Sequence, residues 1–99
     1  MSEVRRLVLD VLKPHQPTML VLADKLGDLE GVNGVDITLI EIDNKVENIK
    51  ITLEGNDIDY QTVAEVVQDS GGSIHSIDKV STGKQLIEEA ETPQDAGAR

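Results

Sequence analysis

The stretch LADKLGDLEGVNGVDITL, residues 22–39, decides the fold, because VAEVVQDSGGSIHSIDKV, residues 63–80, repeats it in outline. Each stretch begins with apolar residues at helical spacing, passes through glycines that can end a helix, and continues as a β-rich run. A predicted strand precedes each helix. Each half of the chain is therefore expected to form a strand, a helix and a return strand, within one domain.

The first strand is predicted for residues 4–12, with apolar side chains on both faces, as in the centre of a sheet. Pro14 and Pro17 end it, because proline cannot donate a hydrogen bond to a strand ladder. Thr18 suits the cap of a helix, and Gly31 is placed to stop that helix. The first helix therefore occupies the interval between these two residues.

The two β-rich runs in the middle of the chain, residues 35–42 and 46–53, are separated by a short polar turn. The second run alternates clearly between apolar and polar residues, which is typical of a half-buried strand. Asp43-Asn44-Lys45 between the runs suits a tight turn. The two runs are therefore predicted to form a β-hairpin.

A second amphipathic helix is predicted after the hairpin, and Gly71 and Gly72 are placed to end it. The last strand is predicted for residues 74–80. Its alternation is broken, because both Ile77 and Val80 are expected to be buried. A β-bulge would explain this pattern, but the alternation does not define its position.

The order β-α-β-β-α-β is the ferredoxin-like pattern. We expect an α+β sandwich with one four-stranded antiparallel sheet in the order 4-1-3-2 and both helices on one face. This domain is expected to cover residues 1–83. Residues 84–99 are expected to form a short helix, KQLIEEAE, followed by a disordered acidic tail.

The composition restricts the classes of partner. Nineteen acidic residues against nine basic ones give a formal net charge of −10, which repels phosphate backbones. Tyr60 is the only aromatic residue of the chain, so the protein offers no set of aromatic side chains on which nucleic-acid bases could stack. No apolar run reaches transmembrane length, and the N-terminus lacks the order of a signal peptide. We therefore expect a cytoplasmic protein with no nucleic-acid and no membrane partner.

The acidic residues are scattered along the whole domain, and the chain contains no cysteine. The absence of cysteine excludes disulfides, thiolate metal sites and thiol catalysis. A scattered acidic excess favours a protein kept dispersed in a salt-rich cytoplasm over one with an acidic binding surface. A halophilic protein is therefore expected.

The two histidines are predicted to approach each other, because the end of the first strand lies beside the start of the last. This arrangement gathers a set of candidate ligand or metal-binding residues: Asp10, His15, His75 and Asp78. Imidazole and carboxylate groups suit a divalent transition metal such as zinc. The simpler interpretation is that Asp10 and Ser76 form a cross-strand polar pair and that both histidines are structural. Catalysis is not expected, because the spacing identifies no nucleophile with an adjacent base.

A second set of candidates consists of carboxylates suited to a hard cation such as calcium: Glu41, Asp43, Asp57 and Asp59. They flank the predicted turn and open the second helix. The NDID stretch lacks the ligand spacing, the glycine and the distal glutamate of an EF-hand. The simpler interpretation is that Asp57 or Asp59 caps the second helix.

The sheet face opposite the helices is predicted from strand alternation to carry four aliphatic side chains: Val8, Leu12, Ile40 and Ile42. Such a face is unusual for a monomer. A partner subunit would cover it, and we therefore expect self-association. The alternative is that the C-terminal segment folds back over this face through Leu86 and Ile87.

Four segments, RRLVLDVLKPH, LEGVNGVDITLIEID, ITLEG and GGSIHSIDKV, together resemble the small archaeal proteins grouped as domain of unknown function two-eleven. The resemblance covers residues 4–83, and LDVLKPH and IHSID are its more specific signals. It implies a ferredoxin-like fold and assembly into ring-like homo-oligomers, and it implies no established activity. The acidic excess fits a haloarchaeal member.

Two other families share the chain order. The LEGVNGV stretch is similar to a passage of heavy-metal-associated domains, but KPHQPT stands where those domains carry CxxC, so their copper and zinc chemistry is not expected. Regulatory domains of the ACT type bind a ligand at a dimer interface. We therefore expect a non-enzymatic, homo-oligomeric binding or scaffold protein, with a divalent metal ion or small anion near His15 and His75. The alternative is a free-standing ACT-like sensor that binds a small metabolite between subunits.

Overall fold

The fold is built on a long, alternating first strand that becomes the centre of the sheet. The computed structural model describes residues 2–88. Its elements in chain order are β1 (Val4–Pro14), α1 (Met19–Gly27), β2 (Val32–Ile42), β3 (Val46–Gly55), α2 (Tyr60–Asp69) and β4 (Ser73–Thr82). The predicted order β-α-β-β-α-β is therefore confirmed.

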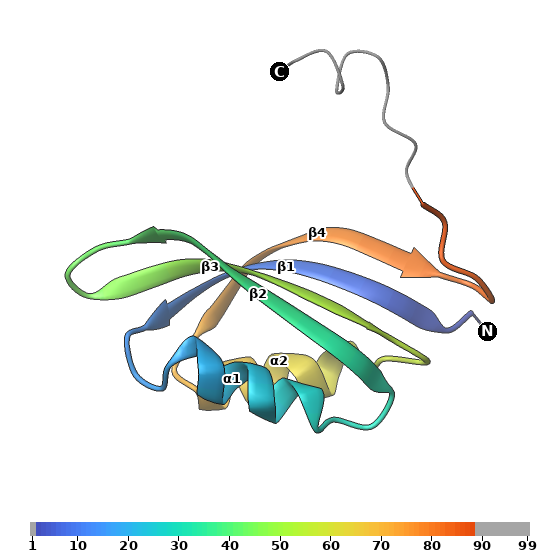
Figure 1. The fold of residues 1–99 in the computed structure, drawn as a ribbon, viewed down its shortest axis with the longest axis horizontal. Helices are drawn as coiled ribbons and strands as arrows, with labels where there is room; N and C mark the ends of the chain where they lie inside the picture. Colours follow the sequence, from blue (N-terminus) through green and yellow to red (C-terminus); the bar gives the residue numbers. More distant parts are fainter. Residues whose placement is uncertain (1, 89–99) are drawn as a thin grey trace, which may run out of the picture.

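The four strands form one antiparallel sheet in the order β2-β3-β1-β4, which is the predicted order read from the other edge. Both helices lie beneath one face of the sheet, and the β2–β3 hairpin extends past them at the left of Figure 1. Among the described residues, no helix covers the opposite face. We call this uncovered surface the open face.

The core lies between the sheet and the two helices. Alternate residues of β1 and β3 point toward the helices, because side chains alternate between the faces of a strand. The core consists of buried aliphatic residues: Leu7, Leu9, Val11, Leu22, Leu26, Ile49, Ile51, Leu53, Ile58, Val63 and Val67. Removing these side chains from water supplies the main driving force for the fold.

Side chains cap both helices at their first turns, as the sequence predicts. The Thr18 hydroxyl accepts a hydrogen bond from the backbone N–H of Val21 at 3.4 Å. The Asp59 carboxylate accepts one from the backbone N–H of Gln61 at 3.1 Å. The first helix is shorter than expected, because it ends at Gly27 and not near Gly31. Glycine is a poor helix former, and the chain turns away one residue later.

The predicted bulge in the last strand is confirmed, and β4 in fact contains two. Its register against β1 shifts between the pairs of Val8 and Leu9, and again between those of Asp10 and Val11. The expected burial of Ile77 and Val80 is wrong, because both are about half exposed. They lie opposite core residues of β1, but β4 is an edge strand with a neighbour on one side only.

The short helix predicted from residue 84 onward is wrong for residues 84–88, which are not helical. The Arg5 guanidinium donates to the carbonyls of Gly83 and Lys84, which ties this segment to the start of β1. Arg6 on the open face pairs with Glu54 at 2.8 Å and reaches Glu88 at 3.4 Å. The rest of the predicted helix and the predicted tail, residues 89–99, lie outside the described residues.

Candidate functional site

A charged cluster lies where β1 meets the hairpin. Leu7, Leu9 and Val11 of β1 face the core, and Lys13 occupies the next position of the same alternation. Its side chain is 0% exposed. A buried lysine needs a counter-charge and hydrogen bonds, because its desolvation is costly. The register places Glu47 of β3 directly opposite Lys13.

Glu47 joins two basic side chains. Lys13 Nζ lies 2.9 Å from Glu47 Oε1 and donates a second hydrogen bond to the carbonyl oxygen of Pro14 at 2.8 Å. The other carboxylate oxygen, Oε2, lies 3.1 Å from Nδ1 of His15. Glu47 is only 14% exposed, and the His15 ring is part-exposed at the protein surface. We call these three residues the Lys13–Glu47–His15 cluster.

The turn of the hairpin continues this network. The Asp43 carboxylate accepts hydrogen bonds from the backbone N–H groups of Lys45 and Val46 at 2.8 and 2.9 Å. These bonds lower the pKa of Asp43, and the nearby His15 ring adds a smaller effect in the same direction. The loop after β1 and the turn between β2 and β3 therefore meet at His15.

The contacts of the cluster shift the pKa values of Glu47 and His15 in opposite directions. The hydrogen bond from Lys13 and then that from His15 lower the pKa of Glu47, against a smaller opposing effect of desolvation. The hydrogen bond to Glu47 raises the pKa of His15, and the backbone of Asn44 adds to this. Both shifts favour the charged forms, so the cluster is held by ionic hydrogen bonds.

These shifts predict a pH window of maximal stability. The pKa of His15 is raised above its ordinary 6.5 in the folded state, so its contribution is complete below about that pH and is lost as the pH rises through the raised value. The pKa of Glu47 is lowered from its ordinary 4.5, so its contribution is complete above that pH and is lost as the pH falls. Urea unfolding across the pH range should therefore show a plateau between these two values.

The histidines provide a matched control for the alkaline side of this window. His15→Asn keeps an uncharged donor near Glu47 and should remove the part of the decline above the plateau that comes from the ring. His75→Asn should leave this decline unchanged, because His75 is an exposed residue of β4. Equal declines in both variants and the wild type would contradict the assignment to His15.

The first predicted set of ligands is not brought together. The strands meet as expected, and Asp10 lies opposite Ser76, as the simpler interpretation requires. His15, however, binds Glu47 on the other side of β1, while His75 lies at a register shift of β4. Asp78 accepts a hydrogen bond from the hydroxyl of Ser76 at 2.6 Å. The expected meeting of the two histidines is therefore wrong, because β1 has a neighbour on each side and the loop after it turns toward β3.

The second predicted set is also separated. Glu41 and Asp43 lie at the hairpin, whereas Asp57 and Asp59 precede α2 at the opposite end of β3. The ten residues of β3 place these ends roughly 30 Å apart. Residues 2–88 contain no group of three or more histidines and carboxylates that could hold a metal ion. The zinc and calcium sites expected from the sequence are therefore not supported by this part of the chain.

Three of the four residues predicted for the open face are exposed. Leu12 is 38% exposed, and Ile40 and Ile42 are each 56% exposed. Val8 is the exception at 9% exposed, because it lies in mid-sheet between Thr52 of β3 and Lys79 of β4. Strict alternation also fails in β2, since a register shift places Glu41, and not Ile40, opposite Asn48.

Four of the exposed aliphatic side chains lie at the hairpin end of the sheet. We call Leu12, Ile40, Ile42 and Val46 the hairpin patch. Three of its members line a shallow hollow of about 260 Å³ together with polar groups: Leu12, Ile42 and Val46 with Glu41, Asp43 and Asn48. The C-terminal segment does not cover the patch as far as residue 88, since Glu88 contacts Arg6 and Ile87 is exposed. The alternative, in which Leu86 and Ile87 fold back over these side chains, is therefore not observed for residues 84–88.

Sequence reasoning did not identify the partnership of Lys13 with Glu47. One signal was available, because Lys13 continues the inward alternation of β1 and a buried lysine requires an acid. Identifying that acid as Glu47 requires the register between β1 and β3, which the local pattern does not contain.

Comparisons with known proteins give a consistent result. The family model DUF211, described as "Uncharacterized ArCR", matches residues 5–96. The uncharacterized protein MJ0319 of Methanocaldococcus jannaschii is 50% identical to this chain over 95 residues, which are 96% of this chain and 98% of the relative. Between residues 2 and 88 there is no helix with the length and apolar character needed to cross a bilayer.

Proposed function

The chain belongs to the DUF211 family, whose model spans the whole Lys13–Glu47–His15 cluster and the hairpin patch, and we propose that it is a non-enzymatic, homo-oligomeric binding or scaffold protein. The observation that carries this proposal is the hairpin patch, which leaves four aliphatic side chains exposed at one end of a sheet. Exposed apolar side chains that line one hollow, as Leu12, Ile42 and Val46 do, are typical of interaction sites. A second copy of the chain is the proposed partner, and a closed ring is one assembly that such a contact can build.

The charged cluster supports a structural role over catalysis. Both oxygens of Glu47 are engaged, one by Lys13 and one by His15. A general base must be within reach of the proton that it removes from a substrate or nucleophile. In the described part of the chain, the ring of His15 is held on Glu47 and the backbone of the turn. These contacts favour a structural role for the cluster, in which it connects β1 and the loop after it to β3.

We propose that assembly buries Ile42, and the solution mass measured by light scattering tests this. In molar salt the wild type should have a mass that is a multiple of the 10.8 kDa chain. Ile42→Asp should weaken association by about 30-fold, because a charge placed in an apolar contact typically costs 2 kcal/mol or more. A single chain mass for the wild type in every condition would refute the proposal.

Leu20→Asp is the matched control. Leu20 is 80% exposed on α1, on the helix side of the molecule. The same substitution there adds the same charge without touching the hairpin. The solution mass of Leu20→Asp should equal that of the wild type. Equal weakening by both substitutions would point to a general charge effect and not to burial of Ile42.

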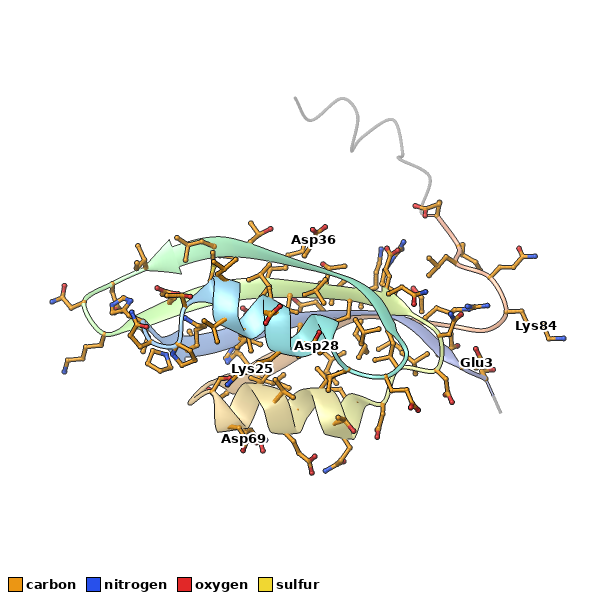
Figure 2. The ribbon with its side chains drawn as sticks, turned by 60° about the horizontal axis from the view of Figure 1, so that its bottom comes forward. Glu3, Lys25, Asp28, Asp36, Asp69 and Lys84 are labelled. Carbon is orange, nitrogen blue, oxygen red and sulfur yellow. The ribbon has the colours of Figure 1, made fainter. Side chains whose placement is uncertain are left out.

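The charge distribution supports a cytoplasmic protein adapted to high salt. Figure 2 labels Asp28 at the C-terminal cap of α1, Asp36 on β2 and Asp69 on α2, so these three acidic residues lie at separate elements. With a net charge of −10, copies repel one another at low ionic strength and are screened at high ionic strength. The same light-scattering series at low salt should therefore show dissociation.

The alternative is a sensor that binds a small metabolite at a subunit interface, as ACT-type domains do. One observation favours it, because the hollow beside the hairpin patch combines three aliphatic residues with Glu41, Asp43 and Asn48. Binding sites typically pair an apolar lining with a few polar groups. A thermal-shift screen distinguishes the two functions: a sensor is stabilised strongly by one class of metabolite, and a scaffold by none.

A further inference from the structure

The Lys13–Glu47–His15 cluster and the hairpin patch are built on the same few residues. Val46 of the patch precedes Glu47 in β3, and Ile42 of the patch lies opposite Glu47 in the register between β2 and β3. On the other side, Pro14 lies opposite Val46. The side chains proposed for self-association are therefore positioned by the backbone that the cluster holds.

His15 is the member of the cluster that reaches across the hairpin turn. It belongs to the loop after β1, and its Nδ1 lies 3.1 Å from Oε2 of Glu47 in β3, while the backbone of Asn44 in the turn also acts to raise its pKa. Three charged groups bear on it: the carboxylate of Glu47, the carboxylate of Asp43 in the turn, and the ammonium of Lys13 beyond Glu47. The Lys13 side chain is fully buried, whereas the His15 ring is 37% exposed, so solvent reaches the His15 ring.

We propose that His15 is a proton-operated latch, which fixes the β2–β3 hairpin in its protonated form and thereby controls self-association through the hairpin patch. This role depends on the self-association proposed above and names its regulation. The protonated ring has two N–H donors, which can serve Glu47 and the turn backbone together. The neutral ring has one donor and loses its ionic attraction to Glu47 and Asp43.

Release of the latch weakens association through the cost of ordering the hairpin. Figure 1 shows that the hairpin extends past both helices, so the contacts beside β1 are its main support. A hairpin that is already ordered binds without that cost, whereas a mobile one must be ordered first. The raised pKa of His15 places the transition above the ordinary histidine value of 6.5. We expect association to weaken about tenfold as the ring loses its proton, within the usual range of coupling between sites.

Sedimentation equilibrium tests the latch by measuring the dissociation constant of self-association. The series runs from about pH 5.5 to about pH 8.5 at fixed molar salt. The wild type should weaken about tenfold across this range. His15→Asn, which retains an uncharged donor, should show a flat profile. His75→Asn is the matched control, since it removes the other histidine, and it should follow the wild type. A flat wild-type profile, or an unchanged slope in His15→Asn, would overturn the latch.

Hydrogen exchange separates failure of the latch from failure of self-association. The amides of Lys45 and Val46 donate to Asp43 in the turn, so they report on its order in the single chain as well as in an assembly. After correction for the intrinsic pH dependence of exchange, their protection should fall with deprotonation in the wild type and stay constant in His15→Asn. A chain that never assembles but shows this change would refute the proposed function and the control of assembly, while the pH-dependent turn would stand.

Discussion

Replacing Glu47 with glutamine is expected to lower the free energy of unfolding by about 3 kcal/mol, because it leaves the ammonium of Lys13 buried without a counter-charge. The Lys13 side chain is 0% exposed and lies 2.9 Å from Oε1 of Glu47. Glutamine retains a hydrogen-bond acceptor, so the loss should lie at the lower end of the range for breaking a buried pair. Urea unfolding in molar salt measures the change as a shift of the midpoint at constant slope.

Lys13→Met is the matched control for this prediction. An unbranched apolar side chain fills much of the same space, and replacing both partners of a buried ion pair with uncharged side chains of similar volume is often close to neutral. The double variant Lys13→Met with Glu47→Gln should therefore be more stable than Glu47→Gln alone. If Glu47→Gln lowers the free energy of unfolding by less than about 1 kcal/mol, the buried ammonium of Lys13 does not depend on the Glu47 carboxylate.

Gly55→Ala is expected to destabilise the fold by about 3 kcal/mol, at the upper end of overpacking effects. A Cβ atom on Gly55 would lie 1.8 Å from the backbone oxygen of Gly31 and 3.0 Å from the backbone nitrogen of Asn33. Backbone atoms cannot move aside as a flexible side chain can. The end of β3 and the start of β2 would have to separate. Thermal unfolding should show the loss as a lower midpoint.

Gly34→Ala is the control, because it lies on β2 opposite the residue before Gly55. A Cβ atom there would meet nothing within 4 Å. Alanine in a strand also loses less entropy on folding than glycine does. Gly34→Ala should therefore be neutral or slightly stabilising. Equal losses at both positions would show that a general requirement for glycine in these strands, and not the approach of Gly31, causes the effect.

The helix caps and the turn show how much local patterns reveal. The sequence predicts Thr18 as one cap and Asp57 or Asp59 as the other, because such side chains bond to backbone groups two or three residues away, and Asp59 is the second cap. Asp43 acts in the same way within the hairpin turn. These interactions join near neighbours in sequence, so spacing alone is enough to predict them.

The candidate site shows where local patterns stop being informative. Both histidines are visible in the sequence, and the neighbouring strands that carry them were predicted correctly. Their partners were not, because contacts across strands depend on register and on the direction taken by the connecting loop. In β4, one extra residue at each of two shifts displaces the expected pairing. In β2, another shift changes which residue faces Asn48.

By itself, the sequence determined the six elements, their order and the order of strands in the sheet, because alternation and helical spacing are properties of neighbouring residues. Only the tertiary structure decided that Lys13 is buried against Glu47, that His15 turns to the hairpin and not to His75, and that the four aliphatic side chains of the hairpin patch are left exposed. The physical reason is that each of these depends on which strands are adjacent and in what register, and a shift of one residue moves a side chain to the other face.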